Sequence, residues 1–368
     1  MKVLLLADAY SIHTIKWAQG LSKRGLEIAI FSLNFNKKEI DPYQNFNNIK
    51  VYYHTDKNVT KSSYGFVKLS YLFALPALKK VITEFKPDIL HAHYASSYGL
   101  LGALSGFHPY IISVWGSDVF DFPNTSFLHK IVLKYNLSVA DKILSTSNVM
   151  AIETSKYTNK EIIVTPFGID LDKFKPLSVQ TIFNKEDIVI GTIKTLEEKY
   201  GIEYLIRAFA IVKNKYNDLP LKLLIVGDGS LRTSLKELAH KLNIDDVTLF
   251  TGKISHDLVP IYDNLLSVSV SVSNSESFGV AVIEASACEK PVIVSDVGGL
   301  PEVVANGITG IIVPPRNAEK TAEAIERLIL DKCLRDRMGK AGRERVSILY
   351  DWNKNVEQMM EVYEKTLV

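Results

Sequence analysis

Short apolar runs alternate with stretches of helical periodicity along nearly the whole chain. In the first half, β-branched runs predict strands at Val3–Ala7, Ile28–Leu33, Asp88–His91, Tyr110–Val114, Lys142–Ser145 and Ile162–Thr165. In the second half, they predict strands at Ile188–Ile193, Lys222–Val226, Val247–Phe250, Val268–Val272, Pro291–Val294 and Gly310–Val313. Helical spacing separates most of these runs, as at Ile202–Lys215, Ser230–Leu242 and Ala318–Leu330. The alternation indicates an α/β protein whose parallel sheets carry helices on both faces.

Two doubly wound, Rossmann-like domains fit this strand pattern in a chain of 368 residues. Proline and glycine interrupt the pattern between Thr165 and Pro176, which predicts the hinge. We therefore expect one domain at residues 1–168 and a second at residues 169–352. The tail, residues 353–368, has helical spacing and is expected to pack back on the first domain. Ligands of open parallel sheets bind at the carboxyl ends of the strands, over helix amino termini.

Composition excludes several classes of protein. Hydrophobic residues make up 47% of the chain and charged residues 23%, as in globular proteins. The two cysteines, Cys288 and Cys333, are too few for a disulfide framework, and no Cys and His cluster has metal-site spacing. We therefore expect a reducing compartment, no bound metal and no cofactor. The apolar start at Met1–Ala7 predicts a buried strand rather than a signal peptide, and no run is long enough to span a membrane, which favours a cytoplasmic protein.

The net charge of +2 is unevenly distributed along the chain. Residues 1–168 hold 18 lysines and arginines against 12 acidic residues, whereas residues 169–368 hold 25 against 29. A basic first half suits an anionic acceptor or peripheral contact with the inner face of a membrane, and an ordinary lysine-rich surface explains it equally well. The stretch Phe66–Phe85 fits either a membrane-contacting helix or one packed on the sheet and broken near Pro76. No dense basic run with interleaved aromatics occurs, so nucleic-acid binding is not expected.

The segment at residues 273–287 carries the most chemical information. A predicted strand ends in a Ser/Asn-rich turn, and a helix begins near Phe278–Gly279. The first-turn amides of a helix lack intrahelical partners, which suits a pyrophosphate, and a glycine lets a ligand approach the backbone. Glu276 precedes this helix and Glu284 lies within it. Both carboxylates can therefore border one pocket and accept hydrogen bonds from the hydroxyls of a ribose or a hexose.

Together with its neighbours, this segment resembles the retaining glycosyltransferases of family 4, the group 1 glycosyl transferases. The signature of that family is a pair of glutamates separated by seven residues with Ser-Phe-Gly inside, here Glu276 and Glu284. The continuation of the motif resembles residues 285–310, and the inter-domain segment of the family resembles residues 166–176. The resemblance covers nearly the whole chain. It implies the GT-B fold, in which two Rossmann-like domains face each other across a cleft.

The resemblance also implies roles for individual residues of the second domain. Glu284 would hold the donor ribose, and Glu276 would contact the transferred sugar in a catalytic role. Lys194 and Lys199 match an Arg and a Lys of the family that neutralise the donor diphosphate. The alternative is that both are ordinary solvated lysines in a loop. The remaining donor-site residues are the diphosphate-binding amides of Ser277, Phe278, Gly279 and Val280 and, near the base, Gly252 to Ile254.

The chain departs from the family pattern at three places. Lys194 replaces the usual Arg and therefore lacks the fork that binds phosphate bidentately. Tyr200 is inserted before Gly201. Trp115 stands where the family often has a His near the transferred sugar, so the hydrogen bond assigned to that His needs another donor.

The first domain offers candidates for the acceptor site. Asp118 keeps the position of a family aspartate and is interpreted as a residue that binds a sugar or acceptor hydroxyl, or else as a cap of the following segment. His93 ends a predicted strand and is a cleft candidate, with a structural histidine as the alternative, whereas His91 is assigned to the core. Ser11 and His13 open the first helix where many relatives have paired glycines, and an ordinary helix cap is the alternative.

We therefore expect an enzyme that transfers a sugar from a nucleoside diphosphate sugar, UDP before GDP, to a hydroxyl of a glycan or lipid-linked acceptor, with retained anomeric configuration. No Asp-x-Asp element occurs, so the lysines and helix amides are expected to stabilise the leaving diphosphate without a metal. The alternatives are a nucleotide-sugar epimerase or phosphorylase on the same fold and a non-catalytic sugar-nucleotide binder. A dinucleotide-dependent oxidoreductase is also considered, because Gly227-Asp228-Gly229 follows a predicted strand.

Overall fold

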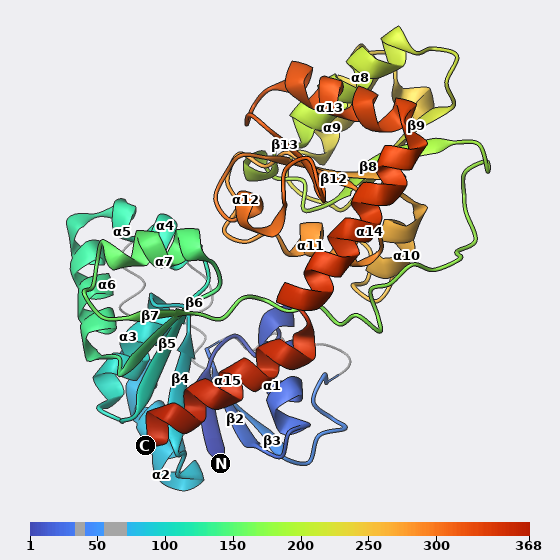
Figure 1. Cartoon of the computed structure of the whole chain (residues 1–368). Coiled ribbons are helices and arrows are strands. Elements are labelled where there is room, and N and C mark those ends of the chain that lie inside the picture. The colour runs from blue at the N-terminus through green and yellow to red at the C-terminus, as the bar shows by residue number, and fades with distance from the viewer. Residues whose placement is uncertain (34–40, 55–71) are drawn as a thin grey trace. The chain divides into compact units, whose positions relative to one another are not determined.

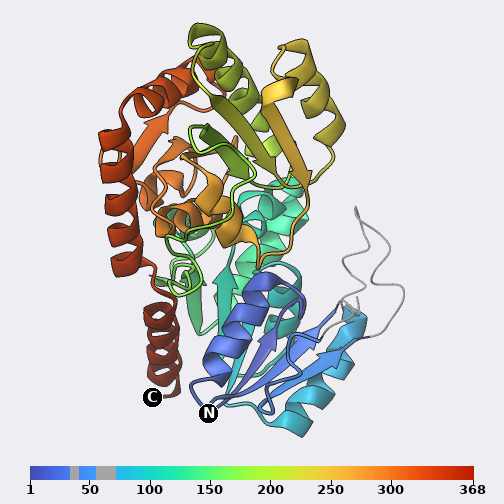
Figure 2. The same ribbon diagram turned by 90° about the vertical axis from the view of Figure 1, so that its right-hand side faces the viewer.

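The computed structural model describes residues 1–33, 41–54 and 72–368. Within them the chain divides into two compact units, which we call the first and second units. The first unit comprises Met1–Pro166 and Asn353–Val368, and the second comprises Phe167–Trp352. Both chain ends therefore lie in the first unit, where Figures 1 and 2 mark them. Residues 66–71 of the stretch for which we considered membrane contact lie outside the described residues.

The first unit is built on a seven-stranded parallel sheet in the order β3-β2-β1-β4-β5-β6-β7. The chain moves outward from β1 to β3 and then returns to the other side of β1 at β4, which makes the sheet doubly wound. The strands are β1 (Lys2–Leu6), β2 (Glu27–Ser32), β3 (Ile49–Tyr53), β4 (Ile89–His93), β5 (Tyr110–Val114), β6 (Lys142–Ser145) and β7 (Ile162–Val164).

Helices cover this sheet, and the last helix of the chain is one of them (Figure 1). The central strands β4 and β5 are buried along their whole length, as expected of parallel strands with helices on both faces. Pro76 lies in the first turn of its helix, where proline is tolerated, and so does not break it. The helices are α1 (Ile12–Ser22), α2 (Leu75–Phe85), α3 (Ser97–Ser105), α4 (Ser117–Phe120), α5 (Phe122–Thr125), α6 (Phe127–Val139), α7 (Asn148–Ser155) and α15 (Trp352–Leu367).

The second unit repeats this plan with a six-stranded parallel sheet in the order β10-β9-β8-β11-β12-β13. Its core joins apolar residues of the strands to the buried faces of the two long helices α8 and α13, which pack on each other. The strands are β8 (Ile188–Ile193), β9 (Leu221–Val226), β10 (Thr248–Gly252), β11 (Val268–Ser271), β12 (Val292–Ser295) and β13 (Gly310–Val313).

Polar side chains fix where several helices of the second unit begin. The Asn317 side chain accepts a hydrogen bond from the Lys320 amide at the start of α13, and Asp331 does the same for Leu334 at the start of α14. The helices are α8 (Ile202–Lys215), α9 (Arg232–Lys241), α10 (Val259–Leu265), α11 (Val280–Ala287), α12 (Leu300–Val303), α13 (Ala318–Leu330) and α14 (Lys332–Leu349), with short 3-10 turns η2 (Glu198–Tyr200) and η3 (Asp245–Val247).

Every strand predicted from the sequence overlaps an observed strand, and the prediction of parallel sheets is confirmed. One strand, β3, was not predicted. Among the described residues it pairs only with β2, at the edge of the first sheet, and its residues are half-buried or exposed. A half-buried edge strand does not give the continuous apolar run by which the central strands were recognised.

Candidate active site

The donor-site residues expected from the sequence all follow the carboxyl ends of strands in the second sheet. Lys194 follows β8, Gly252 ends β10, and Glu276 follows β11. These ends lie at the same edge of the sheet, because adjacent strands run parallel. Glu284 reaches this region from α11, the helix that starts after β11.

Lys194 and Glu276 form an ion pair. The Lys194 Nζ lies 2.5 Å from Glu276 Oε2, and the side chains are 13% and 12% exposed. A charge held so far from solvent is costly unless an opposite charge compensates it. Two residues that were assigned separate roles therefore act together: each holds the other at the sheet edge.

Tyr200 brings a second lysine, Lys199, close to Lys194. The ammonium groups of Lys194 and Lys199 lie 4.5 and 4.8 Å from the centre of the Tyr200 ring, within the range of cation–π attraction. The turn that carries Tyr200 is fixed to the loop after β11, because the amides of Asn274 and Ser275 both donate to the Lys199 carbonyl. The tyrosine inserted relative to the family pattern thus gathers two positive charges beside Glu276.

Two glycines let the loops that carry this ion pair pack closely. Gly227 has a φ of +140°, and a Cβ there would lie 1.9 Å from the Lys194 carbonyl oxygen. Gly298 has a φ of +51°, and a Cβ there would lie 1.7 Å from the Glu276 carbonyl oxygen. Neither position accepts a side chain without moving the loop. The Gly227-Asp228-Gly229 element therefore has a packing explanation that requires no dinucleotide.

Glu284 has a different partner from Glu276. Its side chain is 8% exposed, and its Oε1 lies 3.1 Å from His256 Nε2. His256 belongs to the loop after β10, and its ring contacts Phe174 edge-on. The Lys173 Nζ lies 3.4 Å from His256 Nδ1 and 2.7 Å from Asp257. His256 was not identified from the sequence, although its place six residues after the predicted strand Val247–Phe250 was a usable signal.

A second carboxyl group is buried close to Glu284. Asp263 is 2% exposed, and within the described part of the chain its Oδ2 has no hydrogen-bond partner. Burial, and next the charge of Glu284, raise the pKa of Asp263 well above its usual value, and Lys290 opposes this. Burial and the nearby Glu284 carboxylate thus favour the neutral form of Asp263 more than at an exposed carboxyl group.

The backbone at the amino terminus of α11 is fixed by its own hydrogen bonds and by packing. Gly279 has a φ of +108°, and its carbonyl accepts hydrogen bonds from the Val282 and Ile283 amides. The Phe278 ring is buried edge-on against Phe167 and Tyr350, which fixes the backbone just before the helix. The main chain at this turn is thus held independently of any ligand.

The loop after β10 is fixed as well. The Gly252 carbonyl accepts a hydrogen bond from the Gly227 amide, and the guanidinium of Arg232 lies against Gly252. Ile254 packs with the apolar cluster that covers the outer face of β8 and β9. Arg232 was not recognised in the sequence, and it adds a further cation at this edge of the sheet, paired with Asp228 at 3.4 Å.

Asp118 in the first unit is occupied by backbone contacts. It is 1% exposed, and its two oxygens accept hydrogen bonds from the amides of Ala95, Trp115 and Gly116. Burial raises the pKa of Asp118, and these bonds oppose the rise. The contact of Asp118 with a sugar or acceptor hydroxyl stays a prediction. The alternative, a cap of the following segment, is not seen, because α4 has no side-chain cap and the bonded amides precede this helix.

Histidine and aromatic rings gather around Trp115. His93 lies 4.4 Å and His13 lies 5.7 Å from the Trp115 ring, measured between centroids. His93 is 2% exposed, and its Nδ1 has no hydrogen-bond partner among the described residues. Ser11 sits at the position before α1 but makes no side-chain cap. The structure thus brings His13 and His93 together at the residue that replaces the family histidine.

His91 belongs to the core, as assigned. Its Nδ1 lies 2.7 Å from the Tyr363 hydroxyl and its Nε2 lies 2.7 Å from Ser113 Oγ. Tyr363 comes from α15, so this contact fixes the last helix in the first unit. Burial lowers the pKa of His91 to about 3, which keeps the ring neutral.

Within residues 1–33, 41–54 and 72–368, no group of three or more His, Cys, Asp and Glu side chains is arranged to hold a metal ion. In the same part of the chain, no helix combines the length and the apolar character needed to cross a bilayer.

Comparisons with known proteins identify sequences that this chain resembles. The family model for glycosyl transferases group 1 matches residues 174–345, and that for glycosyl transferase 4-like proteins matches residues 2–147. An uncharacterized glycosyltransferase of Methanocaldococcus jannaschii is 29% identical over 99% of this chain and 98% of its own. N-acetyl-alpha-D-glucosaminyl L-malate synthase of Bacillus anthracis is 28% identical over 93% of this chain and 90% of its own.

Solved structures share the fold. Sucrose-phosphate synthase of Thermosynechococcus elongatus superposes with a TM-score of 0.86 at 23% identity, covering 99% of this chain and 98% of that one. HepE of Anabaena in complex with UDP-glucose gives a TM-score of 0.80 at 17% identity, covering 99% of this chain and 100% of that one. The predicted fold and family are both confirmed. The chain is a glycosyltransferase with the GT-B fold and belongs to the group 1 family, of the family 4 type.

Proposed function

We propose that this glycosyltransferase moves a sugar from a nucleoside diphosphate sugar to an acceptor hydroxyl with retained anomeric configuration, and that the second unit binds the donor. The observation that carries the proposal is the convergence of Lys194 and Lys199 on Tyr200, beside Glu276 at the sheet edge. Two cations held in place next to a helix amino terminus suit a diphosphate leaving group.

Each part of the donor has a candidate partner. Glu284 is proposed to accept hydrogen bonds from the ribose hydroxyls, because a charged carboxylate is a strong acceptor for such paired donors. Glu276 is proposed to contact the transferred sugar. The amides of residues 277–280 are proposed to meet the diphosphate, and Gly252 to Ile254 to border the base.

The proposed reaction breaks the bond between the anomeric carbon and the diphosphate oxygen and forms one to the acceptor oxygen on the same face. The acceptor proton passes to an oxygen of the leaving diphosphate. Lys194 and Lys199 stabilise the charge that develops there. Because these groups are fixed before the donor arrives, little reorganisation is needed in the transition state.

For the donor, UDP-sugars are proposed first and GDP-sugars second. HepE, which shares the fold, was solved with UDP-glucose. A relative from Mycobacterium tuberculosis, 29% identical over 51% of this chain, is a GDP-mannose-dependent mannosyltransferase by name. The first unit is proposed to bind a glycan or lipid-linked acceptor, with His93, His13 and Ser11 as candidate contacts.

A panel of nucleoside diphosphate sugars, tested by thermal shift and then in transfer reactions, examines this proposal. We expect UDP-sugars to stabilise the protein most, and NMR of the product to give the same anomeric configuration as the donor. An inverted product would refute retention. Rapid conversion of the donor without any acceptor would support an epimerase instead, and binding without turnover under all conditions would support a sugar-nucleotide binder.

A further inference from the structure

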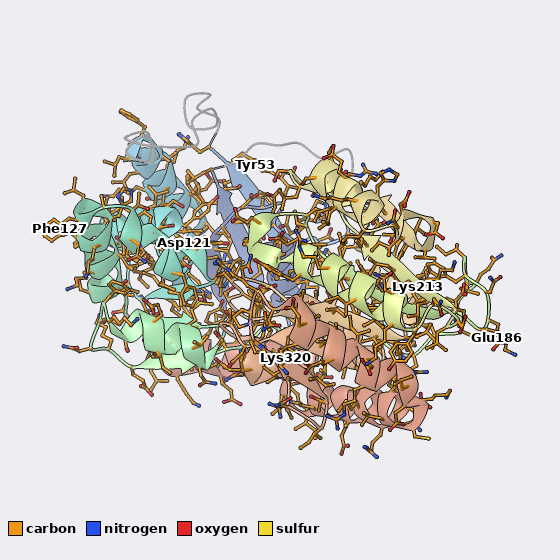
Figure 3. The ribbon with its side chains drawn as sticks, turned by 90° about the horizontal axis from the view of Figure 1, so that it is seen from above. Tyr53, Asp121, Phe127, Glu186, Lys213 and Lys320 are labelled. Carbon is orange, nitrogen blue, oxygen red and sulfur yellow. The ribbon has the colours of Figure 1, made fainter. Side chains whose placement is uncertain are left out.

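Helix α6 of the first unit carries a stripe of exposed apolar side chains. Phe127 is 77% exposed, Leu128 67%, Ile131 46% and Tyr135 42%. Phe127, Ile131 and Tyr135 are four residues apart, so they lie on one side of the helix. Figure 3 shows Phe127 pointing outward from the ribbon. Large apolar groups gathered in this way on a surface mark an interaction site more often than isolated ones do.

The other side of the helix is already used. Leu133 and Leu137 are buried in the core of the first unit, and the Asn136 side chain donates to the Ala95 carbonyl at 2.8 Å. Ser126 accepts a hydrogen bond from the His129 amide and begins the helix. The helix is therefore firmly packed, and the exposed stripe is not explained by a need to form the fold.

Positive charge borders the stripe. Lys130 and Lys134 are exposed on the adjoining side of the helix, and α6 contains no Asp or Glu. The Lys130 ammonium lies 5.8 Å from the Tyr157 ring. The Lys160 ammonium donates to the Ser138 and Ala140 carbonyls, which places a third cation at the carboxyl end of the helix. An apolar stripe edged by lysines suits an interface that combines apolar chains with anionic groups.

We propose that this surface of α6 docks on an anionic lipid membrane. Phe127, Leu128 and Ile131 would enter the boundary between headgroups and acyl chains, while Lys130 and Lys134 would meet lipid phosphates. A second copy of the chain fits less well, because two facing α6 helices would bring four lysines together with no acidic partner on either helix. The proposal does not depend on the donor site, which lies in the other unit.

Sedimentation of the full chain with lipid vesicles tests the proposal. We expect binding to vesicles of phosphatidylcholine mixed with phosphatidylglycerol, weaker binding to phosphatidylcholine alone, and loss of the difference at high salt. The double variant Lys130→Glu/Lys134→Glu should lower partitioning onto the anionic vesicles by about thirtyfold or more. The double variant Phe127→Ser/Leu128→Ser should lower partitioning by about tenfold or more on either vesicle.

Matched variants control for charge and for folding. Lys79→Glu/Lys80→Glu changes two exposed lysines of α2 in the same unit and should affect binding much less. Ile152→Ser removes an apolar side chain that is 65% exposed on α7 and serves as the apolar control. The melting temperature measured by circular dichroism should be the same for all variants and the wild type.

Three outcomes would overturn the proposal. The first is failure of the wild-type chain to bind anionic vesicles. The second is an equal loss of binding for the α2 and α6 lysine variants, which would indicate bulk charge only. The third is a concentration-dependent dimer that Phe127→Ser/Leu128→Ser abolishes, without vesicle binding, which would assign the stripe to a second copy.

Discussion

His256 donates a hydrogen bond from its Nε2 to the Glu284 carboxylate, over 3.1 Å. The direction follows from the other ring nitrogen, because the Lys173 ammonium 3.4 Å away has only donors and requires Nδ1 to accept. His256 is therefore held in one tautomer, and it fixes the orientation of a carboxylate that is nearly buried. This makes His256 a positioning residue for Glu284.

His256→Ala should weaken binding of the nucleoside diphosphate about tenfold, because the loss of a hydrogen bond to a charged group disorders Glu284. The preference for ribose over 2′-deoxyribose should also fall, and isothermal titration calorimetry with both nucleotides measures it. His240→Ala is the control, since His240 is exposed in the same unit and its ring pairs with Asp245. An unchanged ribose preference would contradict the assignment to His256 and leave the donor site itself standing.

The two lysines at Tyr200 should respond differently to substitution. Lys194→Met leaves Glu276 without a partner at 12% exposure and should lower the free energy of unfolding by about 3 kcal/mol, besides reducing turnover. Lys199→Met changes an exposed residue and should reduce turnover with little change in stability. Denaturant titration and product-release assays separate the effects. Lys194→Arg should keep the free energy of unfolding of the wild type. Equal destabilisation by Lys194→Met and Lys199→Met would refute the distinction between the two lysines.

Tyr200→Leu should weaken diphosphate binding about tenfold, because each lysine loses a cation–π contact that holds it in place. Tyr200→Phe keeps the ring and should bind nearly as well as the wild type. Calorimetry with the nucleoside diphosphate gives both values. If Phe and Leu variants weaken binding alike, the hydroxyl rather than the ring face is the important group.

The first unit should lose stability as the pH falls below about 6.5. His91 has its pKa lowered to about 3 by burial, while the unfolded chain takes up this proton near the ordinary value of 6.5. Between these values the unfolded state binds more protons, so each pH unit removes up to about 1.4 kcal/mol. Denaturant titrations at pH 7 and pH 5 measure the loss. His91→Gln should reduce the loss without abolishing it, because burial also lowers the pKa of His93. An unchanged slope would show that other groups are responsible.

Most of the strands and long helices could be predicted, because buried parallel strands and amphipathic helices have clear periods. The prediction for α8, Ile202–Lys215, matches the observed bounds. Edge strand β3 was not predicted, because its residues are only partly buried and do not form a clear apolar run.

The site was predictable only where a motif marked it. Sequence spacing identified Glu276 and Glu284, but it could not show that Lys194 pairs with the first or that His256 contacts the second. Those contacts depend on loops after different strands that meet at one sheet edge. For Asp118, the motif was compatible with a ligand contact and with a cap, and it could not show that three backbone amides outside the following helix bind the carboxylate.

The docking of α15 through Tyr363 and His91 has a consequence for the order of folding. Residues 353–368 complete the first unit, although residues 167–352 come before them in the chain. During synthesis the second unit is therefore finished while the first still lacks a helix, and His91 has no hydroxyl to meet its Nδ1. Since domains tend to fold as units while the chain emerges, the second unit can reach its native state first. Emergence of residues 353–368 then allows the earlier-synthesised part of the first unit to complete its fold.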